Sequence, residues 1–236
     1  MEDATKRFMD LLEHRLIPDF CSNRARNMNP SGFCANANLT NLSEIDKVDF
    51  LRGWDAQLLE HIDSGRYRSG PQSGAFEQFF WSGLKATTPR TFTIWIEPII
   101  ALGVLARMYL DFNWPKALIG TQTKRKWAFD VFGCKSEYDP SLLVACEVKK
   151  SRKEINTLIG DMELFGRQPS SLGEHLKGAK RNSYMKLKAL REDKPRIFWA
   201  VGPDRYEKVF SILYLEDDVI EFTPKSTDAL LYNASY

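Results

Sequence analysis

The chain has 236 residues, of which 43% are hydrophobic and 12% aromatic, and its formal net charge is +2. This composition excludes intrinsic disorder, and the small net charge does not by itself indicate a nucleic-acid partner. The longest apolar run, residues 94–105, is interrupted by Glu97 and Pro98 and is shorter than the roughly 20 residues that cross a bilayer. The four cysteines form no CxxC pair, and the three histidines have no zinc spacing. We therefore expect a cytoplasmic protein with reduced thiols and no membrane partner.

The N-terminal segment begins with a predicted helix. Apolar residues at helical spacing predict an amphipathic helix over residues 2–17, which should end at Pro18. Residues 21–42 are rich in Asn, Ser, Pro and Gly and therefore predict a long loop.

Two further helices are predicted before residue 88. Ser43 is a typical N-cap, and apolar residues follow it at helical spacing as far as Ile62. Residues 75–84 predict a short helix. We expect residues 1–88 to form a helical N-terminal extension, in which the sequence says least about chemistry.

A buried helix and three strands are predicted next. Residues 91–110 are apolar on nearly every side, and Pro98 fits best in a first helical turn, so the continuous helix should begin near Glu97. Three strands are predicted after this helix, at residues 117–121, 126–133 and 142–149. A hairpin-type loop joins the second strand to the third.

The C-terminal part completes an α/β pattern. Ser151 and Glu154 form a predicted capping box, which starts a helix that runs through Phe165. A basic helix and two strands follow, at residues 173–190, 196–201 and 208–215. This order of elements predicts an α/β fold with a mixed sheet, in a core domain of residues 89–236.

Two of the predicted buried strands carry charge at their inner ends. Antiparallel pairing would place Asp130 beside Glu147, and strand alternation places Glu147 and Lys149 on one face. Two neighbouring carboxylates repel unless a cation or a proton lies between them, and hard oxygen ligands suit Mg²⁺ or Mn²⁺. Lys149 beside such a cation could neutralise a phosphate or orient a water. The alternative is a structural ion-pair network at a sheet edge.

This pattern resembles the PD-(D/E)xK nucleases, the restriction-endonuclease-like superfamily. The similarity covers about residues 91–215, and Phe129 stands where the family name has Pro. The resemblance implies a mixed β-sheet core flanked by helices. It also implies that Asp130 and Glu147 hold one or two divalent cations and that Lys149 positions or activates the attacking water.

Many members of this family add an acidic residue from the helix before the sheet. Glu97 is the candidate for this metal-binding and catalytic position, and Glu77 is held in reserve. The alternative for Glu97 is a carboxylate stabilised by the helix dipole. Basic residues are the candidates for contacts with nucleic acid, although each cluster taken alone is typical of a solvated face. These candidates are Lys150, Lys180, Arg181, Lys186 and Lys188.

The function expected from the resemblance is metal-dependent hydrolysis of phosphodiester bonds in DNA by an endonuclease. The resemblance also implies a role in bacterial restriction or antiphage defence, with a homodimer or a partner protein of a defence system as protein partners. One alternative is a nucleic-acid-binding or assembly module that keeps the fold without catalysis. Another is a nucleotide phosphohydrolase, although the chain has no GxxxxGK[ST] loop.

Overall fold

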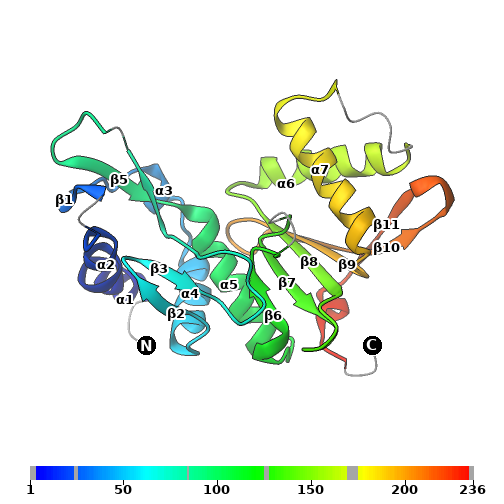
Figure 1. The fold of residues 1–236 in the computed structure, drawn as a ribbon, viewed down its shortest axis with the longest axis horizontal. Helices are drawn as coiled ribbons and strands as arrows, with labels where there is room; N and C mark the ends of the chain where they lie inside the picture. Colours follow the sequence, from blue (N-terminus) through cyan, green and yellow to red (C-terminus); the bar gives the residue numbers. More distant parts are fainter. Residues whose placement is uncertain (1–3, 24–25, 84, 125–127, 169–174, 234–236) are drawn as a thin grey trace.

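A six-stranded sheet with helices on both sides forms the C-terminal half of the molecule (Figure 1). The computed structural model describes residues 4–23, 26–83, 85–124, 128–168 and 175–233. Within these ranges, no helix combines the length and the apolar character needed to cross a membrane.

The strand order in this sheet is β11-β10-β9-β8-β7-β6. Only β8 and β9 are parallel, and the other neighbours are antiparallel. A parallel pair needs a long crossover connection, which α6 and α7 provide. The predicted mixed α/β sheet is therefore confirmed. Its strands are β6 (Ile119–Thr121), β7 (Val131–Cys134), β8 (Leu142–Val148), β9 (Ile197–Val201), β10 (Glu207–Tyr214) and β11 (Ile220–Lys225).

Helices cover both faces of the sheet because its strands are apolar on both sides. Residues Val144 and Cys146 of β8 belong to the hydrophobic core that contains α5 (Ile96–Leu110). Ala145, which points the opposite way, belongs to a second core with α6 (Arg152–Gly166) and α7 (Gly178–Asp193). As predicted, the Ser151 side chain caps α6 by accepting a hydrogen bond from the Glu154 backbone N–H.

The first helical region runs through the proline at which it was expected to end. Helix α1 (Ala4–Leu11), a π-helical turn (Leu12–Leu16) and α2 (Ile17–Cys21) follow without a break. Pro18 lies just after the π-helical turn, where the wider helical geometry accommodates the proline ring and its missing N–H.

The predicted N-cap of the second helix is confirmed, and it forms a capping box with Asp46. The Ser43 hydroxyl accepts a hydrogen bond from the Asp46 N–H, and the Ser43 N–H donates to the Asp46 carboxylate at 3.0 Å. This helix, α4 (Glu44–Asp55), ends well before Ile62. A short helix, α3 (Ala37–Thr40), precedes it.

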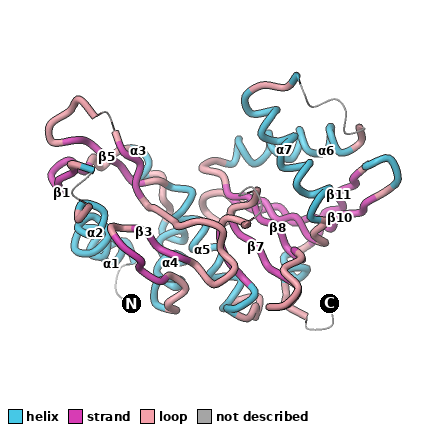
Figure 2. Tube along the Cα trace, in the orientation of Figure 1, coloured by secondary structure: helices cyan, strands magenta, loops and turns pink. Residues whose placement is uncertain are grey.

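The N-terminal extension is only partly helical, contrary to the prediction, because five strands lie within or beside it (Figure 2). The segment expected to form a helix over residues 75–84 instead contains a strand, and part of the predicted loop forms another. The aromatic residues of this region pack across strands, and pairing between distant segments overrides local periodicity. The strands are β1 (Met28–Phe33), β2 (Glu60–Asp63), β3 (Arg66–Arg68), β4 (Phe80–Ser82) and β5 (Arg90–Ile94).

These strands form a three-stranded sheet of order β1-β5-β4 and a β2-β3 hairpin. One hydrophobic cluster contains Phe8 and Phe50 of the extension together with Val144 and Trp199 of the large sheet. The extension therefore packs directly on the core, through α5. The division between residues 88 and 89 stays a prediction.

In the C-terminal half, β11 was not predicted, and the predicted strand over residues 126–133 is shorter than expected. Its first two residues lie outside the described residues, as do the first two of the predicted basic helix over residues 173–190.

An almost buried ion pair links α5 to the large sheet. Both terminal guanidinium nitrogens of Arg107 donate to the Glu207 carboxylate at 2.9 Å, and the Trp199 indole N–H donates to the same carboxylate at 2.9 Å. We expect Glu207→Ala to lower the free energy of unfolding by about 3 to 5 kcal/mol, because Arg107 is left as a buried, unpaired charge. Urea unfolding at pH 7 measures this. Glu216→Ala, at an exposed position, should cost less than about 0.5 kcal/mol, and equal effects of the two changes would contradict the prediction.

Candidate active site

The register of β7 and β8 brings the two predicted carboxylates together. Val131 pairs with Cys146 in antiparallel register, and the Asp130 N–H donates to the Cys146 carbonyl at 3.0 Å. Continuing this register by one residue places Asp130 opposite Glu147. The predicted proximity of these two residues is confirmed.

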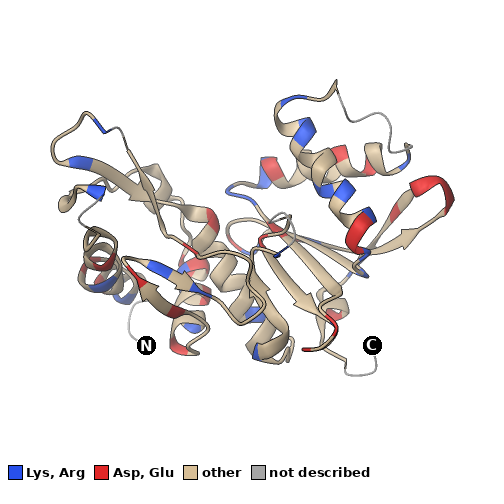
Figure 3. Ribbon diagram, viewed as in Figure 1, with Lys and Arg blue, Asp and Glu red and all other residues tan. Residues whose placement is uncertain are grey.

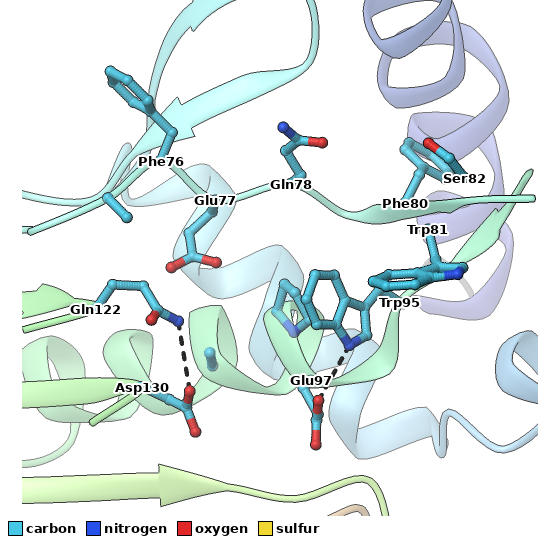
Figure 4. Close-up of a pocket in the computed structure, with 13 residues that line it drawn as sticks. Phe76, Glu77, Gln78, Phe80, Trp81, Ser82, Trp95, Glu97, Gln122 and Asp130 are labelled. Carbon is cyan, nitrogen blue, oxygen red and sulfur yellow. Dashed lines mark hydrogen bonds between the residues drawn. The ribbon is translucent and has the colours of Figure 1, made fainter. Parts of the chain in front are cut away.

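Asp130 is held by hydrogen bonds from two directions. Its Oδ2 accepts from the Val148 N–H at 2.8 Å, and its Oδ1 lies 3.5 Å from Nε2 of Gln122 (Figure 4). Burial, and then the nearby negative charge of Glu147, raise the pKa of Asp130 to about 7. Asp130 thus changes its charge near neutral pH.

Glu147 is only 1% exposed and lies between two lysines. Its Oε1 is 2.5 Å from Nζ of Lys149, and its Oε2 is 2.6 Å from Nζ of Lys186. Burial alone would raise the pKa of Glu147, but the two ammonium groups outweigh burial and lower it. Burial would likewise lower the pKa of Lys149, but the Glu147 charge outweighs it and raises that pKa. Glu147 and Lys149 therefore remain charged together.

Lys186 lies inside the site, and its predicted contact with nucleic acid stays a prediction. It was expected among the basic residues of a helical wall that contacts phosphate, but it reaches from α7 into the site and donates to the Ala128 carbonyl as well as pairing with Glu147. Helical spacing is the sequence signal that could have located Lys186, because it places this residue on the same helix face as Ala179 and Ser183.

Glu97 lies in the first turn of α5, at the junction of two clefts. Its Oε2 accepts a hydrogen bond from the Trp95 indole N–H at 3.1 Å, and its negative charge contributes to the raised pKa of Lys149. The Glu97 side chain is half-buried and accepts this hydrogen bond, so the cost of its partial burial is offset.

Both clefts are large enough to hold part of a substrate. The first, of about 550 Å³, is lined by Glu97, Asp130, Gln122 and Glu77 together with several aromatic side chains (Figure 4). The second, of about 730 Å³, lies between the sheet and α6 and α7. Its charged lining residues are Glu97, Glu147, Lys149, Lys153, Glu154 and Lys186.

Among the residues that the structure describes, no three His, Cys, Asp or Glu side chains gather closely enough to hold a metal ion. The chemistry of the donors nevertheless suits Mg²⁺ or Mn²⁺, since Asp130, Glu147 and Glu97 offer only hard oxygens. Oε2 of Glu147 is buried and has no hydrogen bond of good geometry from any described residue, although the Lys186 ammonium lies close to it. Such an oxygen can bind a cation. In the structure, Lys149 and Lys186 supply the positive charge that a cation would bring.

The remaining basic candidates lie outside the two clefts. Lys150 forms an exposed ion pair with Glu154 at 3.7 Å. Figure 3 shows basic residues along the helices above the sheet. Lys180, Arg181 and Lys188 are exposed on α7 and are not among the residues that line either cleft, so their contact with nucleic acid stays a prediction.

Several polar residues that line the clefts were not predicted as parts of the site. Lys153 and Asn182 line the second cleft, and Gln122 approaches Asp130. Glu77, held in reserve as a helical carboxylate, lies instead in an extended segment whose backbone pairs with Tyr67. Lys153, Asn182 and Gln122 carry no sequence signal that distinguishes them from other polar residues.

Comparison with known proteins leaves the family open. No protein-family model, no curated protein and no solved structure matches the chain. The geometry of the site is therefore the basis for inferring its function.

The raised pKa of Asp130 predicts a specific dependence of stability on pH. An ordinary Asp titrates near 3.9, so between this value and about 7 the folded protein binds the extra proton and the free energy of unfolding falls as pH rises. Without metal, we expect the wild type to lose roughly 2 to 4 kcal/mol between pH 5 and pH 8 relative to Asp130→Asn.

Urea unfolding in EDTA at both pH values measures this difference. Asp139→Asn, in the exposed loop between β7 and β8, is the matched control and should retain the loss. The same loss in Asp130→Asn would show that Asp130 does not titrate in this range.

Proposed function

We propose that this protein is a divalent-metal-dependent nuclease that hydrolyses phosphodiester bonds in DNA. The observation that carries the proposal is the placement of Asp130 opposite Glu147, with Lys149 paired to Glu147, at the place where two clefts meet. The resemblance to the PD-(D/E)xK nucleases supports the same assignment, because the residues with this geometry are those that carry the resemblance.

Asp130 and Glu147 would hold Mg²⁺ or Mn²⁺. Glu97 is the candidate for a third carboxylate, which would have to approach the other two, because no three such side chains gather closely enough among the described residues. The ion would lower the pKa of a water molecule and offset negative charge on the phosphate. Lys149 lines the second cleft with its ammonium next to Glu147, so it can donate hydrogen bonds to a phosphate oxygen and stabilise charge that develops there. Lys186 can do the same from α7.

The second cleft is the best path for the nucleic-acid backbone. Lys153 and Lys186 supply positive charge to its walls, and Asn182 supplies a neutral donor. The exposed residues Lys180, Arg181 and Lys188 extend the basic surface beyond the cleft. A role in restriction or antiphage defence, as a homodimer or with a protein partner, belongs to the same proposal.

A second candidate function is a nucleic-acid-binding module without catalysis. One observation favours it: both oxygens of Glu147 already have a lysine partner, so the charge of this carboxylate is balanced without a metal. A structural ion-pair network would have the same geometry. Activity measurements separate the two candidates.

We expect Asp130→Asn, Glu147→Gln and Lys149→Met each to reduce Mg²⁺- or Mn²⁺-dependent cleavage by about 100-fold or more, since each removes an oxygen ligand or a charge donor from the site. Supercoiled plasmid, linear duplex and single-stranded DNA are the substrates, with EDTA as the blank. Lys149→Met should still bind Mn²⁺.

Lys135→Met is the matched control, because Lys135 is exposed in the loop after β7, pairs with Asp139 at 3.5 Å and does not line either cleft. It should cleave at nearly the wild-type rate. Undiminished cleavage by folded Asp130→Asn would exclude the proposed site, and metal-independent DNA binding without any cleavage would favour the second candidate.

A further inference from the structure

The first cleft carries aromatic side chains that phosphodiester hydrolysis does not require. Trp81 is 61% exposed and Trp95 is 38% exposed, and their rings meet edge to face with centroids 5.6 Å apart (Figure 4). Large exposed rings that gather in a cleft commonly mark a binding surface. The guanidinium groups of Arg66 and Arg68 lie over the ring of Phe76 at another edge of the cleft.

The cleft also offers an unused hydrogen-bond acceptor. Glu77 is only 6% exposed, and burial raises its pKa, although side-chain hydrogen bonds from Thr121 and Gln122 oppose this. Its Oε1 has no hydrogen-bond partner among the described residues. Its carboxylate points toward the side on which Gln122 and Asp130 lie (Figure 4). A buried, unpartnered oxygen of this kind is costly unless a ligand or water satisfies it.

This cleft is continuous with the proposed catalytic site, because Asp130 and Glu97 line it. A nucleotide whose phosphate lies at Asp130 could therefore place its base among the aromatic side chains. The cleft volume of about 550 Å³ is in the range of small-molecule sites. In a duplex both faces of a base are covered by its neighbours, so only an unpaired base can enter such a cleft.

We infer that the first cleft binds one unpaired nucleobase next to the phosphate that is cleaved. This inference rests on the proposed nuclease function and specifies its substrate as single-stranded DNA or DNA with a locally unpaired nucleotide. Trp81 stacks on the base, and Oε1 of Glu77 accepts a hydrogen bond from the base edge. The carboxylate favours cytosine or adenine, whose exocyclic amino groups donate, over thymine.

The test measures binding in EDTA, where metal-dependent cleavage does not occur. Fluorescent single-stranded oligonucleotides and the corresponding duplex are titrated with wild type, Trp81→Ala and Trp81→Phe. Because stacking on an aromatic side chain stabilises each base by about 1 to 3 kcal/mol, Trp81→Ala should weaken single-strand binding by roughly 5- to 100-fold. Trp81→Phe should retain most of the affinity, and duplex binding should not change.

Tyr138→Ala is the matched control, because Tyr138 is an aromatic residue that is 97% exposed in the loop between β7 and β8. It should bind single strands like the wild type. Glu77→Gln should reduce the preference for oligo-dC over oligo-dT. Equal affinities of wild type and Trp81→Ala for single strands, or equal losses for single strand and duplex, would overturn the inference.

The outcomes also separate this inference from the proposed function. Cleavage of DNA by the wild type, with single-strand affinity unchanged in Trp81→Ala, would leave the nuclease standing and remove the base subsite. Selective loss of single-strand affinity in Trp81→Ala, without cleavage by any variant, would establish the base subsite on a protein that is not a nuclease.

Discussion

The burial of one negative charge governs the arrangement around the candidate site. Glu147 is an interior residue of the sheet, and an isolated carboxylate there would be strongly destabilising. Lys149 compensates it from the same strand, and Lys186 compensates it from α7. Helix α7 must therefore dock at this end of the sheet, and its docking closes one wall of the second cleft. The contacts that compensate the buried charge of Glu147 are therefore also the contacts that place Lys149 and Lys186 at the candidate site.

Helix α5 joins this charged site to the rest of the molecule. It is apolar on nearly all sides because it packs on the sheet and on the N-terminal elements at once. Its first turn presents Glu97 between the two clefts, and farther along it Arg107 binds Glu207. The N-terminal extension consequently supplies part of the first cleft, through Glu77 and Trp81, and is an integral part of the candidate site.

Local signals in the sequence were sufficient for the centre of the sheet and insufficient for its surroundings. Strand alternation and a short connecting loop predicted the pairing of Asp130 with Glu147, and capping chemistry at Ser43 and Ser151 located two helix starts. Strands β4 and β5 pair with each other and were missed because their aromatic residues also fit a helical period, while the further partner of β5, strand β1, is distant in the chain. The role of Lys186 depends on how α7 packs, which no local pattern of charges reveals.

The parallel pairing of β8 with β9 has a consequence for how the chain folds. This pairing closes a much longer loop than the β7–β8 hairpin does, so loop-closure entropy predicts that the hairpin closes first and that the segment carrying Lys186 docks later. Until then, Glu147 has only Lys149 as its partner within the hairpin segment. A partly folded chain thus contains both carboxylates in register but lacks one wall of the cleft, and the site becomes complete only with the last long-range pairing of the sheet.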